Sequence, residues 1–143
     1  MRSALWIVVS LIALVGVIAI AGYFLPVEHD ASRTADFTKP PEAVWALIQD
    51  PDSYSAWWDG ADVQTAVVER VPPSRLVTRI VEETQFGGTW TFEIVKTDAG
   101  SRLTITERGE IYNVLFRALA KYVFGYTSTM DDFLTALKLK LST

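Results

Sequence analysis

Residues 89–109, which read TWTFEIVKTDAGSRLTITERG, decide the fold of this 143-residue chain. Apolar and polar side chains alternate over residues 89–96 and again over residues 102–109. Because successive strand residues point to opposite sides of a sheet, both stretches predict strands with one buried face. That face carries Trp90, Phe92, Ile94, Leu103 and Ile105. Residues 98–100 (DAG) are typical of a tight turn, so the whole stretch predicts a β-hairpin.

Further strands are predicted on the N-terminal side of this hairpin. Residues 63–71 and 75–83 are rich in β-branched side chains and are separated by two prolines, and residues 32–37 alternate in character. The pair Gly87-Gly88 is interpreted as a turn before the hairpin. Together these segments predict an antiparallel meander with one apolar face.

Helical patterns flank the strands. Pro40-Pro41-Glu42 predicts a helix start, and a second short helical turn is expected at residues 52–58. After Asn113, apolar side chains recur every three or four positions over residues 114–141, which predicts one continuous helix with a bend allowed at Gly125. The predicted fold class is α+β, with the long C-terminal helix lying across the sheet.

The N-terminal segment has a different character. Residues 4–25 (ALWIVVSLIALVGVIAIAGYFL) carry no charge and only one polar side chain, Ser10. A helix of that length spans roughly 33 Å, enough to cross a hydrocarbon core of roughly 30 Å. Residues 1–25 are therefore predicted to be a single transmembrane anchor, joined to the domain by a linker at residues 26–31.

A cleaved signal peptide is the alternative interpretation of this segment. Ala19-Ile20-Ala21 fits a small-x-small cleavage site, and cleavage near Ala21 would release a secreted domain. The anchor is preferred because the apolar run continues beyond this site. Arg2 precedes the run and Glu28 and Asp30 follow it, so the positive-inside rule favours a cytoplasmic N-terminus and a domain outside the cytoplasm.

Composition excludes several classes of function. The chain has no cysteine and one histidine, which excludes disulfide scaffolds, thiolate metal sites and multi-histidine metal centres. Its net charge of −4 argues against nucleic-acid binding, which depends on neutralising phosphates. We therefore expect no metal, no cofactor and no nucleic-acid partner. His29 is interpreted as a solvated residue beside the membrane exit.

Several blocks of the domain resemble a known family. They are residues 44–47 (VWAL), 50–57 (DPDSYSAW), 72–80 (PPSRLVTRI), 88–93 (GTWTFE), 103–113 (LTITERGEIYN), 116–119 (FRAL) and 124–130 (FGYTSTM). Their order resembles the START-like, Bet v 1-like superfamily of polyketide cyclase/dehydrase and lipid transport proteins (SRPBCC), over residues 32–143. The resemblance implies a helix-grip fold, in which an antiparallel sheet wraps around the C-terminal helix and leaves an apolar pocket between them.

One departure from the family lies between Trp58 and Val63. Only four residues separate these positions, whereas the family places two or more strands there. The sheet is therefore expected to be short, with five strands and an exposed edge at residues 63–71. Such an edge invites pairing with a second copy, so a homodimer is a predicted partner state.

Glu107 is the one candidate for chemistry. Alternation places it on the inward face with Leu103 and Ile105, where a carboxylate needs a partner, and Arg79 is the expected one. It would then be a polar anchor in a ligand pocket or a general base. The preferred interpretation is that the strand ends at Thr106 and leaves Glu107 solvated at the mouth.

The aromatic side chains belong either to the core or to the pocket that the resemblance implies. The predicted ligand-binding residues are Trp57, Trp90, Phe92, Ile94, Leu103, Ile105, Glu107, Leu119, Tyr122, Tyr126 and Met130.

Three functions follow from these interpretations. The preferred one is a membrane-anchored, non-catalytic module that binds a hydrophobic small molecule or lipid. The second is a cyclase- or dehydratase-type enzyme that uses Glu107 and a tyrosine as acid and base. The third is a degenerate, self-associating relative without a pocket.

Overall fold

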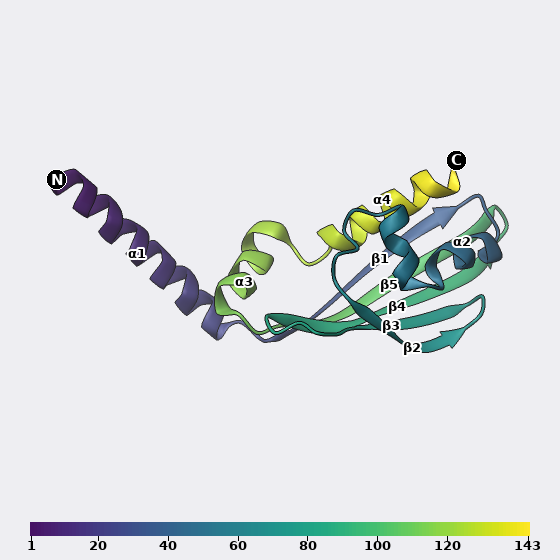
Figure 1. Ribbon diagram of the computed structural model, residues 1–143, viewed down its shortest axis with the longest axis horizontal. Coiled ribbons are helices and arrows are strands. Elements are labelled where there is room, and N and C mark those ends of the chain that lie inside the picture. The colour runs from purple at the N-terminus through teal and green to yellow at the C-terminus, as the bar shows by residue number, and fades with distance from the viewer.

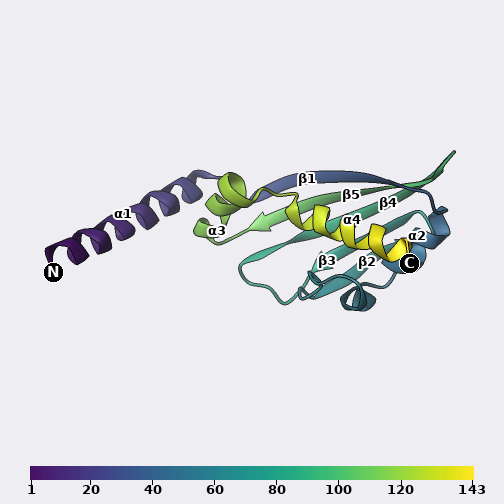
Figure 2. The same cartoon turned by 90° about the horizontal axis from the view of Figure 1, so that it is seen from above.

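Five strands form one antiparallel sheet in the order β1-β5-β4-β3-β2 in the computed structural model, which describes residues 1–143 (Figure 1). The elements are, in chain order, α1 (Arg2–Phe24), β1 (Glu28–Phe37), α2 (Pro41–Ile48), a 3-10 turn (Pro51–Ala56), β2 (Thr65–Val71), β3 (Arg75–Ile80), β4 (Phe86–Thr97), β5 (Gly100–Ile111), α3 (Val114–Leu119), a π-helical turn (Ala120–Phe124) and α4 (Ser128–Leu141). Helices α2 and α4 cover one face of the sheet, and α1 extends away from this double layer (Figures 1 and 2). The predicted α+β fold with one apolar N-terminal helix is confirmed.

The core lies between the sheet and the helices α2 and α4. Alternate positions of β3, β4 and β5 point toward the helices, as the period of two in the sequence predicts. The largest fully buried side chains are Leu76, Phe92, Leu103 and Ile105 from the sheet, Ile48 from α2, and Met130, Phe133 and Leu137 from α4. Each side chain of this size stabilises the fold by about 1.5–3 kcal/mol. The hairpin face predicted from the sequence is therefore the floor of the core.

The hairpin β4–β5 is longer than predicted. Thr97 pairs with Gly100, so the predicted turn is confirmed, and the pairing continues to Phe86 and Ile111 at the other end. The predicted turn at Gly87-Gly88 is wrong, because both residues lie within β4. Gly88 has a φ of 128°, and a Cβ there would overlap the carbonyl of Arg108. Glycine is needed here for close approach of the two strands rather than for a turn.

Strand β1 begins earlier than predicted. It pairs with β5 from Glu28↔Glu110 to Phe37↔Ser101, so residues 28–31 belong to the sheet and the predicted linker at residues 26–31 is wrong over most of its length. The strand was hidden in the sequence because its first four residues include three polar ones. Pairing along β5 holds this segment extended despite its weak local preference.

The predicted continuous helix over residues 114–141 is wrong. Gly125 has a φ of 75°, a conformation that ends the π-helical turn, and α4 begins only at Ser128. The apolar spacing continues across the break at Gly125 because the segment before it, residues 114–124, and α4 after it each carry an apolar face. They face different neighbours, since α4 packs on the sheet and α3 packs on α1.

Strand β2 is one edge of the sheet, as predicted, and residues 57–64 form turns without a further strand. Most of its side chains are exposed. Pairing of this edge with a second copy stays a prediction.

Tyr54 in the 3-10 turn holds the end of α2 in place. Its hydroxyl donates a hydrogen bond of 2.6 Å to the carbonyl of Ile48, one of the helix-end carbonyls that lack a partner within the helix. Burial raises the pKa of the Tyr54 hydroxyl, so the hydroxyl stays a donor even in alkaline solution where an exposed tyrosine ionises.

Replacing Tyr54 with phenylalanine keeps the ring and removes this hydrogen bond. We expect Tyr54→Phe to lower the free energy of unfolding by about 1–2 kcal/mol, because the buried carbonyl loses its donor. Tryptophan fluorescence during denaturant unfolding of the full chain in detergent measures the change. Tyr112→Phe removes an exposed hydroxyl that donates to Glu110 and is the matched control. Equal effects of the two substitutions would contradict the capping role.

Candidate functional site

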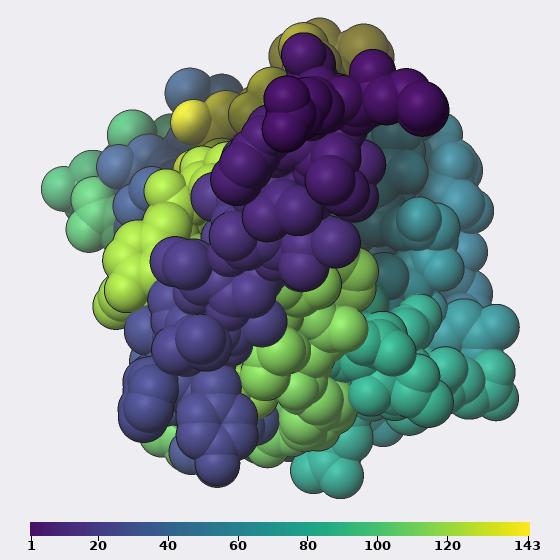
Figure 3. All heavy atoms as spheres, turned by 90° about the vertical axis from the view of Figure 1, so that its left-hand side faces the viewer, coloured from purple at the N-terminus to yellow at the C-terminus, as the bar shows by residue number.

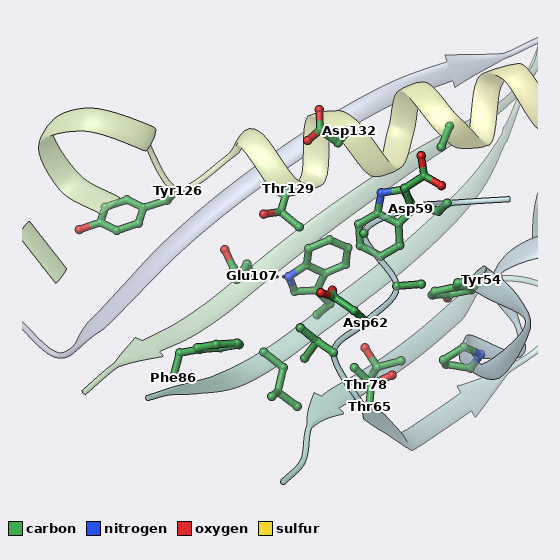
Figure 4. A pocket seen from close by; sticks show the side chains of 18 of the residues that line it. Tyr54, Asp59, Asp62, Thr65, Thr78, Phe86, Glu107, Tyr126, Thr129 and Asp132 are labelled. Atoms are coloured by element: carbon green, nitrogen blue, oxygen red, sulfur yellow. Dashed lines mark hydrogen bonds between the residues drawn. The ribbon is translucent and has the colours of Figure 1, made fainter. Parts of the chain in front are cut away.

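A cleft of about 1140 Å³ lies between the sheet, α4 and the turns at residues 57–63. Its floor comes from β3, β4 and β5, one wall from α4, and one end from α3 and the π-helical turn. Figure 4 shows Tyr126 and Phe86 toward one end of the cleft, Tyr54 toward the other, and Glu107 between them. Residues far apart in the sequence therefore surround one hollow.

Aromatic rings form much of the apolar lining. The ring centroids of Trp58 and Trp90 are 6.2 Å apart, and each ring lies edge-on to Phe133, at 5.0 and 5.7 Å. Phe133 is fully buried, so these contacts fix the position of both indoles. Edge-to-face packing at such distances is the favoured geometry for aromatic pairs.

Glu107 lies in the middle of this aromatic surface. Its Oε1 accepts a hydrogen bond of 3.1 Å from Nε1 of Trp90, and its Oε2 lies 3.4 Å from Nε2 of His29. Its side chain is 18% exposed. The preferred interpretation of Glu107 as a solvated residue beyond the strand end is therefore wrong, because β5 continues to Ile111.

The predicted pairing of Glu107 with Arg79 is also wrong. Thr78, Trp90 and Glu107 pair in one row across β3, β4 and β5 and so share the cleft face. Arg79 is one residue further along and lies exposed on the other side of the sheet. Neighbouring residues of a strand point to opposite faces of the sheet, so the face of Arg79 depends on where β3 begins and how it pairs. The sequence alone did not fix that pairing.

His29 is the partner that the sequence analysis missed. Its imidazole stacks on the ring of Tyr126, with centroids 4.1 Å apart and planes inclined by 13°, and its side chain is 12% exposed. The interpretation of His29 as a solvated linker residue is wrong because β1 already includes it.

Gly109 makes this position possible. It pairs with His29 across β1 and β5, and a Cβ at residue 109 would overlap the imidazole ring. Gly109, two positions after Glu107, was the one sign in the sequence that a side chain packs over this part of β5. That the side chain is His29 follows only from the pairing of β1 with β5.

The structure divides the predicted ligand-binding residues into three groups. Those that line the cleft are Trp57, Trp90, Phe92, Glu107, Leu119 and Tyr126. Those that are buried in the core without lining the cleft are Ile94, Leu103, Ile105 and Met130. Tyr122 is 67% exposed on the π-helical turn and does not line the cleft.

Acidic residues line the cleft in addition to Glu107. Asp59 and Asp62 come from the turns after the 3-10 turn and Asp132 comes from α4 (Figure 4), and Glu110 comes from β5. Asp59, Asp62 and Asp132 take part in none of the ion pairs of the structure. Lys140 is the single lysine or arginine of the lining. The cleft therefore has a negative electrostatic potential, which the sequence analysis did not predict.

Trp57 contributes a polar group of another kind. Its Nε1–H is buried and has no hydrogen-bond partner within the protein. Leaving such a donor unsatisfied costs about 1–3 kcal/mol. An acceptor atom that reached it would recover part of this cost.

The single histidine makes the contact with Tyr126 directly observable. We expect the imidazole proton signals of His29 to be shifted upfield by the tyrosine ring in NMR spectra of the full chain with labelled histidine in micelles. Tyr126→Ala removes the ring and is expected to abolish the shift, and Gly109→Ala displaces the imidazole with the same result. Tyr122→Ala removes an exposed tyrosine close by in sequence and is the matched control. An unchanged spectrum in Tyr126→Ala would contradict the stacked geometry.

No protein-family model matches the chain, and no curated protein is detectably similar to it. Solved structures do share its fold. A START superfamily protein from Mycobacterium smegmatis is 17% identical, with a TM-score of 0.61, and the match covers 80% of this chain and 97% of that one. A protein from Mesorhizobium loti (16% identity, TM-score 0.62, 80% and 97% covered) and an uncharacterized protein from Rhizobium leguminosarum (13% identity, TM-score 0.61, 80% and 95% covered) are similar to the same extent. The chain therefore has the START-like fold that the sequence motifs predicted, preceded by one long apolar helix.

Proposed function

We propose that this protein is a membrane-anchored module that binds a neutral or cationic hydrophobic small molecule in the cleft. The observation that carries the proposal is the arrangement of the cleft itself, in which aromatic side chains line the walls and the Trp90 indole holds the Glu107 carboxylate among them. The START-like fold supports a ligand-binding role in general, and the chemistry of the lining narrows the class of ligand.

The size and lining of the cleft support a hydrophobic ligand. Pockets for small molecules commonly measure about 300–1,000 Å³ and are mostly apolar, with a few polar groups that fix orientation. This cleft, at about 1140 Å³, is slightly larger than that range and so has room for such a ligand. Each methylene buried in it would contribute about 0.8 kcal/mol to binding.

The charges of the lining argue against an anionic ligand such as a fatty acid. The cleft is lined by five carboxylates but only one lysine and one histidine, and four of the carboxylates, Asp59, Asp62, Glu110 and Asp132, are in no ion pair. A ligand carboxylate would be repelled by them, whereas an amine or hydroxyl could donate to Glu107.

Helix α1 supports the membrane location. It has 23 residues, and its most apolar window has a mean hydropathy of 2.8 and contains no buried residue. A helix of that length spans about 35 Å, and Arg2 before it and Glu28 after it favour a cytoplasmic N-terminus.

Retention of α1 is favoured over cleavage near Ala21, because the next residue is packed against the domain. A Cβ at Gly22 would overlap the backbone of Val114 in α3. The buried guanidinium of Arg117 donates to the carbonyls of Gly22, at 3.0 Å, and Leu25, at 3.1 Å. The last turn of α1 is thus part of the folded domain.

An acid–base enzyme is the second candidate function. The specific observation in its favour is the His29–Glu107 pair, which faces the cleft and is shielded from solvent. Two titratable groups in contact beside an apolar site are a common arrangement for moving a proton.

Ligand binding can be tested with a matched pair of probes. We expect 11-(dansylamino)undecanoic acid methyl ester to bind the full chain in micelles, with adducts detected by native mass spectrometry. The free acid is expected to bind at least about tenfold more weakly, a difference of about 1.4 kcal/mol, because of repulsion by the carboxylates.

A blocked cleft provides the control for that experiment. Ala136→Trp fills the cleft from α4 and is expected to remove most of the ester adduct, whereas Ala66→Trp places the same side chain on the outer face of β2. Equal adducts in the two variants would contradict binding in the cleft. A preference for the acid would contradict the proposed ligand class alone.

Glu107→Gln separates the binding module from the enzyme. For a binding module, we expect the compounds extracted from purified wild type and variant to be the same, at lower occupancy in the variant. An enzyme would instead yield product from the wild type and an accumulated precursor from Glu107→Gln. Mass spectrometry of the extracts distinguishes the two, and Glu110→Gln makes the same change at a neighbouring position of the cleft as the control.

A further inference from the structure

Large apolar side chains are exposed together on α3 and the π-helical turn. The set, here called the α3 patch, consists of Phe116, Tyr122, Val123 and Phe124, each at least half exposed. Soluble proteins rarely expose so many large apolar side chains within nine consecutive residues, and such patches mark interaction sites. The core packing of the domain does not use this surface.

The position of the α3 patch is fixed relative to α1. Arg117 lies in the same helix and donates four hydrogen bonds, two to the end of α1 and two to the carbonyls of Ile111 and Tyr112 at the end of β5. Gly22 is the one buried residue of α1 because α3 packs on it. Figure 3, seen from the end that carries α1, shows α3 in yellow-green directly against the purple and blue atoms of α1.

This placement puts the α3 patch at the depth where α1 leaves the membrane. The last turn of α1 carries Tyr23 and Phe24, both exposed, which are residue types that favour the headgroup level. Since α3 packs beside this turn, its exposed side chains reach the same level.

The charges of the segment fit the same environment. Residues 114–124 (VLFRALAKYVF) contain no acidic residue, although the chain as a whole has a net charge of −4. Lys121 is exposed between the apolar side chains, where its ammonium group can reach lipid phosphates while its stem stays among apolar groups.

We infer that the α3 patch is embedded in the interfacial layer of the bilayer that holds α1. The inference rests on the proposed role of α1 as a membrane anchor and adds a second membrane contact made by the domain. Phe116 and Phe124 belong to the α3 patch and also line the cleft, and Leu119, which lies between them in the sequence, lines the cleft as well. The end of the cleft formed by these residues therefore opens against lipid.

The cysteine-free chain allows a direct test by single-site spin labelling of the full chain in phosphatidylcholine nanodiscs. Val123→Cys reports on the α3 patch, and Val95→Cys on β4 is the matched control, since the native side chains are 66% and 55% exposed. Val15→Cys reports on α1. We expect the ratio of oxygen to nickel-chelate accessibility at residue 123 to be several-fold above that at residue 95.

The labels at residues 15 and 123 test the membrane anchor and the embedded α3 patch separately. A label at residue 15 in lipid, with residue 123 as accessible to nickel as residue 95, overturns the inference and leaves the anchor intact. A label at residue 15 in water overturns the anchor and the inference together. Protection of residue 123 from both reagents, with dipolar broadening between labels, shows that a second copy covers the patch and overturns the inference.

Discussion

Pairing along strand β5 is the constraint on which the rest of the structure depends. All twelve of its residues pair with β4 along one edge, and residues 101–110 pair with the whole of β1 along the other. This double pairing keeps β5 extended beyond Thr106 and so carries Glu107 into the cleft. It also brings the carbonyls at the strand end to Arg117, which connects the sheet to α1. One strand thus connects the core, the cleft and the N-terminal helix.

Glu107 shows how a carboxylate can be kept among aromatic rings. Removing a charge from water costs several kcal/mol unless hydrogen bonds replace the lost hydration. The indole of Trp90 and the imidazole of His29 each supply one contact, to different oxygens. A carboxylate can accept about four hydrogen bonds, so Glu107 retains capacity for a further donor. Its position is therefore fixed by the protein while part of its hydrogen-bonding potential faces the cleft.

The sequence predicted those features that depend on local patterns. Alternation at residues 89–109 identified the hairpin and its buried face, and the motifs around it predicted the START-like fold. Six of the eleven predicted ligand-binding residues line the cleft, namely Trp57, Trp90, Phe92, Glu107, Leu119 and Tyr126. Ile94, Leu103 and Ile105 share their face but lie under α2 and α4, because alternation gives the side of a sheet and not what covers each position along it.

The features that the sequence did not predict depend on contacts between distant segments. His29 meets Glu107 only because β1 starts at Glu28, and polar residues concealed that start. The helix break at Gly125 was concealed because α3 and α4 each have an apolar face, and only the packing of α3 on α1 separates them. Arg117 lay off the apolar stripe and resembled an exposed residue, although the structure buries it among four carbonyl groups.

The joint at Arg117 has a consequence for how such a protein would work in a bilayer. Tethered domains commonly have a flexible spacer after the span, which lets them swing outward and meet a distant membrane. Here only three residues, 25–27, separate α1 from β1, and the guanidinium of Arg117 bonds the end of α1 to the end of β5, so no free spacer lies between the helix and the domain. If α1 spans a bilayer as proposed, the reach of the domain would be limited to the leaflet beside it. A compound held in the cleft would be presented in place to whatever meets that surface, and would not be ferried across the aqueous gap to another membrane.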